Sequence, residues 1–517
     1  MSMENLLFDA LLRPHGDNSA PFLFPEKGGP VSFAAFLRLS ARYANLFESL
    51  GVAKGDRVAV QVAKSPQALA LYAACVRSGA ALLPLNPAYT TDEVAYFAGD
   101  AEPRLLICAP AAQAALAPIA SRHGATVLTL DRDGSGSLAD AAHAADTHHA
   151  PRACGPDDLA AILYTSGTTG RSKGAMLSHA NLLSNAQVLA DLWRFSSGDV
   201  LLHALPIFHT HGLFVAVNVC LQSGAAMIFH EGFIVDAILN ALPRATTMMG
   251  VPTFYTRLLQ SPRLTRQATE HMRLFISGSA PLLAETHDAF ASRTGHRILE
   301  RYGMTETNMN SSNPYEGARR AGTVGFALPG TEIAITDPES GGPVPPGEIG
   351  MIEVRGPNVF SGYWKMPEKT AEELRPNGFF ITGDLGQFDD RGYLSIVGRQ
   401  KDLIISGGYN IYPREIELLI DELEGVAESA VFGVPDPDFG EAVIAAVVAD
   451  GSGVATADMI LDQCRLKLAR FKHPRQVILL DDLPRNAMGK VQKNLLRERH
   501  APGPSPAGRP NSITVRR

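Results

Sequence analysis

Residues 164–174 read YTSGTTGRSKG and directly follow an apolar run at residues 159–163. Glycine adopts backbone angles that other residues resist, so successive N–H groups in such a loop can converge on one anion. Hydroxyl side chains and a lysine add donors and positive charge for phosphate oxygens. The pattern therefore predicts a strand that delivers a polyphosphate-binding loop. Its candidate ligands are Thr165, Ser166, Gly167, Thr168, Thr169, Gly170 and Lys173.

Two other interpretations compete for this loop. A solvated turn has a similar composition. A P-loop requires Gly, four residues, and then Gly-Lys-Ser/Thr, whereas Ser172 precedes Lys173 here and Gly174 follows it. The loop instead resembles, nearly residue for residue, the phosphate loop of the acyl-adenylate-forming superfamily, which includes acyl-CoA synthetases, adenylation domains and luciferases.

A second segment, ERYGMTET at residues 300–307, resembles the nucleotide-binding segment of the same superfamily. Tyr302 offers a flat face for adenine, and Thr305 can donate to the α-phosphate. Glu306 supplies a hard oxygen ligand for Mg²⁺, although without the resemblance it is an ordinary helix or turn carboxylate. The resemblance implies that the nucleotide also contacts Glu300, Arg301, Gly303, Met304, Ser279 and Ala280.

The resemblance extends to residues near the end of the chain. Asp384, in FITGD, and Arg399 match the positions that bind the ribose. Lys490, in PRNAMGK, matches the lysine that bridges the attacking carboxylate and the α-phosphate. Lys401 matches a hinge between two domain poses. The segment that would line the tunnel for coenzyme A contains Ser406, Gly407, Gly408 and Tyr409.

The implied reaction has two steps and uses ATP, Mg²⁺ and coenzyme A. A carboxylate attacks the α-phosphate to give an acyl-AMP, while Mg²⁺, Lys490 and the loop with Thr165 and Lys173 carry the developing charge. The thiol of coenzyme A then displaces AMP. Because acetylation would remove the charge of Lys490, a lysine acetyltransferase and a deacetylase are expected as regulatory partners.

The acid itself is predicted from pocket residues. Arg257, one helical turn from Thr253, and Arg301, directly before Tyr302, offer guanidinium groups that match a carboxylate in two-point geometry. His209 matches a position that gates the acyl pocket, and Ser279 could donate to the substrate. Thr210 and Met309 are candidates for limiting a 2-substituent. The combination resembles malonyl-CoA synthetases, which also accept methylmalonate.

Three functions fit parts of this pattern. The first is a malonate–CoA ligase, and the second is a ligase for a neutral short or branched acid. The third is an inactive nucleotide sensor or scaffold, which is disfavoured because every charged residue expected in the adenylating site is present. A metal site at His209 and His211 lacks a nearby third ligand in the sequence. The charged residues in question are Lys173, Glu306, Asp384, Arg399 and Lys490.

The surrounding elements must position these residues. Apolar periodicity predicts helices at 33–50 and 68–78 and strands at 56–61 and 80–84. This alternation indicates an α/β fold: a large layered N-terminal domain of mixed sheets and helices at 1–400, and a small mobile α+β domain at 401–499. For the small domain the expected helices are 413–423 and 459–468, and the expected strands are 429–434, 442–448 and 476–480. Residues 500–517 are expected to be disordered.

Composition sets the outer limits. The 517 residues suffice for more than one domain. A net charge of −7 gives no electrostatic reason to expect nucleic acid or an anionic membrane as a partner. Five scattered cysteines suit buried thiols in a reducing compartment. The N-terminus lacks the pattern of a signal peptide, and no apolar run reaches the ~18 residues of a membrane span. A cytoplasmic location is therefore expected.

Overall fold

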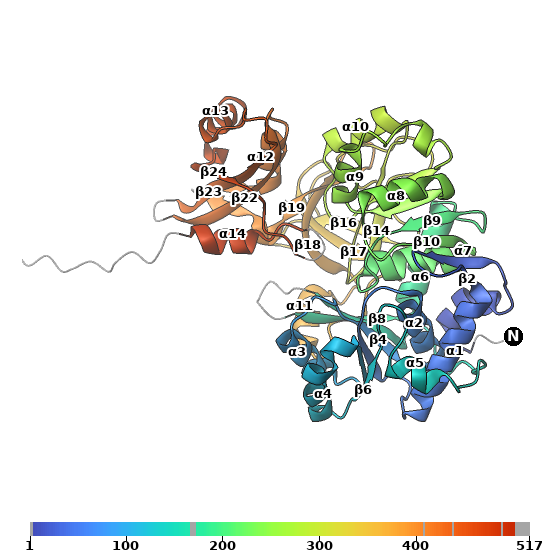
Figure 1. Ribbon diagram of the computed structural model, residues 1–517. Coiled ribbons are helices and arrows are strands. Elements are labelled where there is room, and N and C mark those ends of the chain that lie inside the picture. Colours follow the sequence, from blue (N-terminus) through green and yellow to red (C-terminus); the bar gives the residue numbers. More distant parts are fainter. Residues whose placement is uncertain (1–3, 166–171, 407–408, 437–438, 487–489, 502–517) are drawn as a thin grey trace, which may run out of the picture. The chain divides into compact units, whose positions relative to one another are not determined.

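The computed structural model describes residues 4–165, 172–406, 409–436, 439–486 and 490–501 (Figure 1). The chain divides into two compact units. The first comprises Met1–Thr382 and Gly386–Ile396, and the second comprises Gly383–Leu385 and Val397–Arg517. The division lies beside the predicted joint, but it assigns residues 383–385 to the second unit. The predicted disorder of the tail concerns residues that, from 502 onward, lie outside the described part of the chain.

The first unit begins with a six-stranded sheet whose strands are parallel except for its last pair, β7 and β8. In spatial order the strands are β6 (Thr126–Thr129), β5 (Leu105–Cys108), β3 (Arg57–Gln61), β4 (Ala81–Pro84), β7 (Leu159–Thr165) and β8 (Lys173–Ser178). One face carries α3 (Thr91–Ala101) and α4 (Gln113–Arg122), and the other carries α1 (Phe33–Ser49), α2 (Pro66–Ser78) and α5 (Ser137–Ala142) (Figure 1). The side chains of β3 alternate between these two cores, as the two-residue period of a strand requires.

The candidate acid-binding residues lie in a second, nine-stranded sheet or in the loops and helix that follow its strands. In spatial order its strands are β15 (Phe326–Ala327), β14 (Asn308–Ser312), β13 (Leu299–Met304), β12 (Leu274–Ser277), β11 (Thr247–Gly250), β9 (Val200–His203), β10 (Ala226–Phe229), β1 (Pro21–Pro25) and β2 (Val31–Ser32). Strands β1, β10, β9, β11, β12 and β13 are parallel to one another, whereas β2 pairs antiparallel with β1 and β14 pairs antiparallel with β13. Because the carboxyl ends of parallel strands meet at one edge, the loops that follow β9 and β12 are brought together there.

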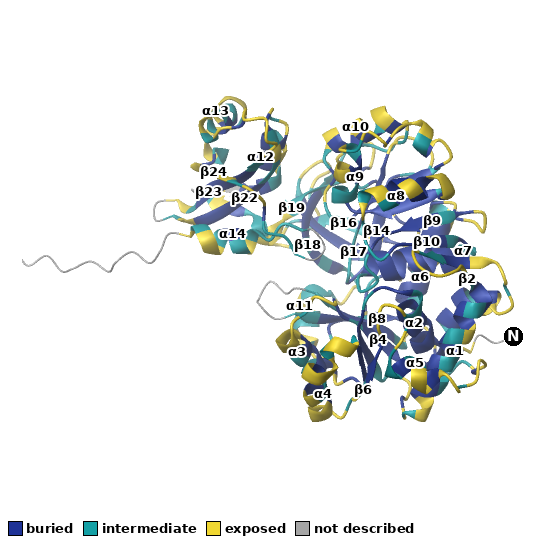
Figure 2. Cartoon of the chain, viewed as in Figure 1, coloured by how far each residue is buried: buried dark blue, intermediate teal, exposed yellow. Residues whose placement is uncertain are grey.

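Helices cover both faces of the nine-stranded sheet. Helices α8 (Val235–Ala241), α9 (Pro252–Leu259) and α10 (Ala284–Thr294) pack on one face. Helices α6 (His179–Leu192) and α7 (Asn218–Ser223) pack on the other, in a core that also includes residues of the six-stranded sheet. Figure 2 shows both sheets as buried layers and shows exposed residues on the outer helices.

A four-stranded sheet runs through the division between the units. It comprises β16 (Glu332–Thr336), β17 (Gly350–Arg355), β18 (Phe380–Phe388) and β19 (Leu394–Arg399), with α11 (Pro367–Glu373) between β17 and β18. The second unit contains β20 (Ile404–Ser406), β21 (Tyr409–Ile411), β22 (Val426–Asp436), β23 (Gly440–Ala449), β24 (Gln476–Leu480), α12 (Pro413–Asp421), α13 (Ala457–Lys467) and α14 (Lys493–His500). Helices α12 and α13 pack on one face of its sheet and α14 packs on the other. The predicted α/β fold with a small α+β second domain is confirmed.

Hydrogen bonds to Asp199 connect the starts of three parallel strands of the nine-stranded sheet. Its Oδ1 lies 2.7 Å from Arg273 Nε and its Oδ2 lies 2.9 Å from Arg273 Nη2, while Thr246 Oγ1 donates to Oδ1 at 2.7 Å. These residues directly precede β9, β12 and β11. Burial alone would raise the pKa of Asp199, but hydrogen bonds from Arg273, Thr246 and Ser196 outweigh burial and lower the pKa. The ionised carboxylate therefore stabilises the strand register at the base of the site.

Replacing Arg273 with Met should destabilise the first unit by about 3 kcal/mol, because it leaves a buried carboxylate without its charged partner. Urea unfolding followed by tryptophan fluorescence measures this, since both tryptophans, Trp193 and Trp364, lie in this unit. The lowered pKa of Asp199 contributes stability above the unfolded value of about 4, which is lost as the pH falls through the folded pKa. The difference from wild type should therefore shrink below about pH 4; an equal difference at pH 3 and pH 7 contradicts the assignment.

Candidate active site

The phosphate-binding loop connects two paired strands. Thr165 ends β7 and Lys173 begins β8, and the two residues are register partners. The predicted ligands Ser166, Gly167, Thr168, Thr169 and Gly170 lie outside the described residues. The prediction that a strand leads into the loop is confirmed, because Thr165 ends β7 and Lys173, on the other side of the loop, begins β8.

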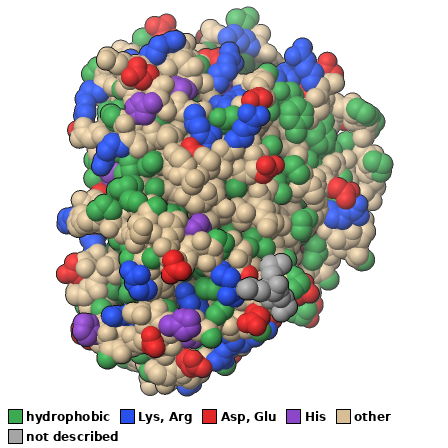
Figure 3. Space-filling model, turned by 90° about the vertical axis from the view of Figure 1, so that its right-hand side faces the viewer, with side chains coloured by type: hydrophobic (Ala, Val, Ile, Leu, Met, Phe, Trp, Pro, Cys, Tyr) green, Lys and Arg blue, Asp and Glu red, His purple; other side chains and the backbone are tan. Residues whose placement is uncertain are grey.

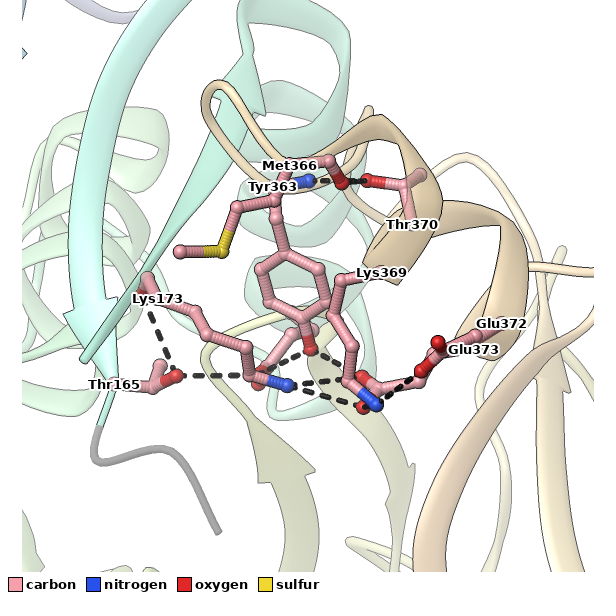
Figure 4. Close-up of polar contacts among 9 residues, drawn as sticks. Thr165, Lys173, Tyr363, Met366, Lys369, Thr370, Glu372 and Glu373 are labelled. Carbon is pink, nitrogen blue, oxygen red and sulfur yellow. Dashed lines mark hydrogen bonds and ion pairs between the residues drawn. The ribbon is translucent and has the colours of Figure 1, made fainter. Parts of the chain in front are cut away.

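Lys173 is held by a carboxylate and an aromatic ring from a distant part of the chain (Figure 4). Its Nζ lies 3.1 Å from both carboxylate oxygens of Glu373 and 4.0 Å from the centroid of the Tyr363 ring. Burial alone would raise the pKa of Glu373, but hydrogen bonds from Tyr363, Lys369 and Lys173 outweigh it and lower the pKa. Glu373 is therefore ionised and fixes the ammonium group of Lys173.

Glu306 lies at the same end of the site. Its Oε1 is 3.1 Å from the Tyr363 hydroxyl and 3.5 Å from Thr165 Oγ1. The side chain is buried, and burial raises its pKa. In the described part of the chain no three His, Cys, Asp or Glu residues gather as metal ligands. Mg²⁺ commonly takes one or two carboxylates together with substrate phosphates and water, so Glu306 suits this role with a nucleotide supplying further oxygens.

The segment at residues 300–307 forms a β-hairpin, with Glu306 in the turn between β13 and β14. Tyr302 is buried and packs against Ile352, Val354 and Leu394. Glycine is required at position 303, because a Cβ there would lie 1.8 Å from the backbone oxygen of Asn308. Glu300 is buried, whereas Met304 and Thr305 are half-buried. The hairpin thus joins the predicted adenine, phosphate and metal residues in one element.

Arg301, one of the predicted acid-binding residues, is a buried cation. The residue is 3% exposed. Within the described residues, none of its three guanidinium nitrogens has a hydrogen-bond partner. Burial lowers its pKa to about 9, so it remains charged at neutral pH. Gly278 permits its position, because a Cβ there would lie 2.4 Å from Arg301 Cζ. An unpaired buried cation is costly, so this position favours an anionic ligand.

His211 joins Arg301 and Ser279 in this part of the site. Its Nδ1 lies 3.2 Å from Ser279 Oγ, and Ser279 adopts a left-handed backbone with φ of 71°. Burial, and then the positive charge of Arg301, hold the pKa of His211 well below its usual value. His211 is therefore neutral. The sequence singled out His209 as the gate; this residue is half-buried, and its Nδ1 accepts from the His211 backbone N–H at 3.3 Å.

The other predicted acid-site residues differ in burial. Thr210 and Met309 are both buried, and Thr210 Oγ1 donates to Asn308 Oδ1 at 2.8 Å, directly beside Met309 in the chain. Arg257 lies on α9 and is exposed. The structure thus separates the two arginines by environment, and the contact of Arg257 with the acid stays a prediction. Ala280 is half-buried beside Ser279.

The second unit contains the predicted ribose pair. Arg399 Nε lies 2.9 Å from Asp384 Oδ1, and the Asp384 side chain is buried. Lys401 is exposed in a short 3-10 helix, Gln400–Asp402. The Lys490 backbone N–H donates to Asn486 Oδ1 at 3.0 Å, and the Asn486 backbone N–H donates to Lys490 O at 2.9 Å. These contacts join Asn486 to Lys490.

The segment predicted to line the tunnel for coenzyme A is described only in part. Ser406 pairs with Tyr409 across the β20–β21 hairpin. The exposed Tyr409 ring stacks on Phe471, with centroids 4.6 Å apart. Gly407 and Gly408 lie outside the described residues. The roles of Ser406 and Tyr409 remain predictions.

Three contributors to the site were not predicted: Tyr363, Glu373 and the part that His211 plays beside Arg301. Tyr363 and Glu373 lie some 200 residues after Lys173 in sequence, and no local pattern connects them. His211 could have been found, because it belongs to the same His-x-His-Gly motif as His209.

The charge distribution on the surface and the apolar character of the helices concern binding to nucleic acid and to membranes. Figure 3 shows basic and acidic side chains interspersed over one face of the molecule. Among the described residues, no helix combines the length and apolar character needed to cross a bilayer.

Comparison with known proteins connects these features to a family. A family model for AMP-binding enzymes matches residues 12–364, and one for the C-terminal domain of AMP-binding enzymes matches residues 415–490. A feruloyl-CoA synthase from an Amycolatopsis species is 37% identical over 477 residues, which span 91% of this chain and 94% of that protein. The malonate–CoA ligase of Arabidopsis thaliana is 35% identical over 486 residues, which span 87% and 79%.

Solved structures give the same result. ATP-bound MatB from Rhodopseudomonas palustris is 57% identical, covers 96% of this chain and 98% of its own, and superposes with a TM-score of 0.94. The chain belongs to the AMP-binding enzyme family of adenylate-forming ligases, and it is an ATP-dependent acyl-CoA ligase.

Proposed function

We propose that this ligase joins malonate, and also methylmalonate, to coenzyme A through an acyl-AMP intermediate, with release of pyrophosphate and AMP. The observation that carries the proposal is the environment of Arg301. It is buried, charged and without a hydrogen-bond acceptor among the described residues. A carboxylate at the far end of a small diacid would accept from the guanidinium in two-point geometry.

Relatives support the proposal and also show its main alternative. The malonate–CoA ligase of Arabidopsis thaliana and MatB resemble this chain over most of its length. The feruloyl-CoA synthase, however, is as similar in sequence as the malonate–CoA ligase. Similarity to these two relatives therefore does not select the acid, whereas MatB, at 57% identity, is more similar to this chain than either. The alternative is a ligase for a neutral short or branched acid, which a buried, unpartnered Arg301 disfavours because a neutral tail would leave the cation unpaired.

The residues of the first unit would have different roles in the proposed reaction. Lys173 and Thr165 would bind the ATP phosphates, and Glu306 would hold Mg²⁺, which supplies positive charge at the phosphate oxygens when bound. Arg301 and Ser279 would orient the diacid so that its free carboxylate meets the α-phosphate. His209 would gate the pocket, and the buried Thr210 and Met309 would limit a 2-substituent. The bridging role of Lys490 and the hinge at Lys401 remain predictions from the sequence.

Replacing Arg301 with Met should reduce kcat/KM for malonate by roughly tenfold to over a hundredfold, because a charge-assisted bond contributes about 1.5–3 kcal/mol. The same variant should change acetate activation little. AMP release with coenzyme A and a panel of malonate, methylmalonate, acetate and butyrate measures both effects. Arg263→Met, at an exposed position, is the control for loss of one positive charge, and Arg257→Ala tests the second predicted arginine.

Thermal unfolding gives an independent readout of the same variant. Malonate should raise the Tm of the wild type and leave that of Arg301→Met unchanged, because only the wild type would bind the second carboxylate. Without ligand, the variant should be at least as stable as the wild type, since an unpaired buried cation is lost. Equal loss of malonate and acetate turnover would show that Arg301 is structural and that the diacid pocket is wrong.

Replacing Glu373 with Gln should raise the KM for ATP by about tenfold, because Lys173 loses the carboxylate that fixes it. ATP–pyrophosphate exchange measures this. Glu372→Gln is a matched control: Glu372 is the preceding residue, and it contacts Lys369 at 2.7 Å with its side chain 64% exposed. It should change the KM less than twofold. Tighter ATP binding by Glu373→Gln would instead mean that Glu373 competes with the phosphates for Lys173.

Replacing Lys490 with Ala should abolish adenylation, because charge stabilisation at the α-phosphate is lost, and should leave thioester formation from preformed malonyl-AMP largely intact. The two half-reactions are measured separately. Similar loss in both steps contradicts the predicted role. Acetylation of Lys490 by a lysine acetyltransferase would have the effect of this variant, and treatment with a deacetylase should then restore adenylation.

A further inference from the structure

Lys64 is a buried lysine beneath the loop that carries His209. It directly precedes Ser65, the N-cap residue of α2. Its Nζ lies 2.7 Å from His203 Nδ1, 3.0 Å from the His203 carbonyl oxygen and 2.9 Å from the Leu205 carbonyl oxygen. It also lies 4.3 Å from the centroid of the Phe229 ring. Its three polar contacts all go to the end of β9 and the loop after it.

The neighbours of His203 fix the protons in this contact. His203 Nε2 lies 2.8 Å from the Gly212 carbonyl oxygen, which can only accept, so Nε2 carries the hydrogen. His203 is neutral, because burial and the nearby Lys64 hold its pKa well below its usual value. Nδ1 therefore accepts from Lys64. Since the two carbonyl oxygens also accept, Lys64 donates three hydrogen bonds, which requires an ammonium group.

This charged form is maintained against an opposing effect. Burial lowers the pKa of Lys64, and the carboxylates of Glu26 and Glu231 counteract burial only at a distance. Three acceptors and the face of the Phe229 ring together stabilise the ammonium group. An apolar side chain would avoid the burial of a charge, but it would leave the Leu205 carbonyl without this donor.

The contacts bracket one loop. Lys64 binds residues 203 and 205 at its start, and the His203 ring binds residue 212 at its end. His209, Thr210 and His211 lie between these points. The closure is tight, because a Cβ on Gly212 would lie 2.1 Å from the Pro206 backbone oxygen. The π-helix His211–Val217 begins at the closed end.

We propose that Lys64 is a positioning residue for the acid-binding loop and that it acts through His203. The ammonium group orients the His203 ring, and the ring holds residue 212, so the two ends of the loop stay in register with the sheet. The proposal rests on the proposed function only in that this loop binds the acid, and it does not depend on which acid is bound.

Replacing Lys64 with Met tests the proposal by ATP–pyrophosphate exchange. The KM for malonate should rise by about tenfold, as expected for loss of charge-assisted contacts, while the KM for ATP changes less than twofold. Arg132→Met is the matched control. Arg132 and Lys64 line one cavity, but Arg132 pairs with Glu231 at the surface. Loss of Arg132 should therefore leave the KM values for malonate and ATP unchanged.

Two substitutions of His203 separate its contacts. In His203→Gln, the amide nitrogen of the new side chain would replace Nε2 toward Gly212, but the acceptor for Lys64 would be lost. In His203→Asn, the amide oxygen would keep that acceptor, and the bond to Gly212 would be lost. Both variants should raise the KM for malonate. His203→Gln breaks a contact that Lys64→Met also breaks. The double variant Lys64→Met/His203→Gln should therefore have a KM for malonate close to that of Lys64→Met alone.

Three results would overturn the proposal: an unchanged KM for malonate in Lys64→Met with only a lowered Tm, equal increases in the KM values for malonate and ATP, or additive effects in the double variant. The wild type is measured first. Failure of malonate to support exchange by the wild type contradicts the proposed function, and the loop is then tested with whichever acid the wild type activates.

Discussion

The burial of one guanidinium group without a protein acceptor among the described residues is the constraint on which the proposed acid-binding end of this site depends. Arg301 lies within a strand of the nine-stranded sheet, against the backbone of Gly278, and burial lowers its pKa without removing its charge at neutral pH. A protein that only needed to fill this space would be more stable with an apolar side chain. The structure therefore keeps a cation where it reduces stability, which is typical of functional sites.

A single hairpin links this cation to the phosphate end. In β13, Arg301 lies against Gly278, and the next residue, Tyr302, packs in a different apolar cluster, because neighbouring side chains in a strand point to opposite faces. The turn that follows carries Glu306, which reaches Lys173 through Tyr363 and Glu373. The spacing between Arg301 and Glu306 is thus set by the backbone of β13 and its turn. Movement of this hairpin would shift both ends together.

Sequence was sufficient to predict the fold. The helix predicted at 68–78 forms α2 (Pro66–Ser78), and the strand predicted at 56–61 forms β3. Thr165, Lys173 and Glu306 could be singled out because Gly-rich turns and charged residues lie next to one another in the chain, and the structure brings Thr165 within 3.5 Å of Glu306; their roles stay predictions. Glu373 and Lys64 were not found, since each acts across more than a hundred residues and each looks like an ordinary surface residue in its local sequence. The contrast between buried Arg301 and exposed Arg257 was also beyond the sequence, because it depends on which face of an element meets the core.

The electrostatics of the acid end argue for a particular kind of substrate. Burial and Arg301 keep His211 neutral, so His211 adds a hydrogen-bonding group beside Arg301 and no second charge. One carboxylate of a diacid could pair with Arg301 while the other stays free to attack the α-phosphate. A buried guanidinium with a neutral imidazole beside it therefore suits the proposed short diacid, which must be held at one end and react at the other.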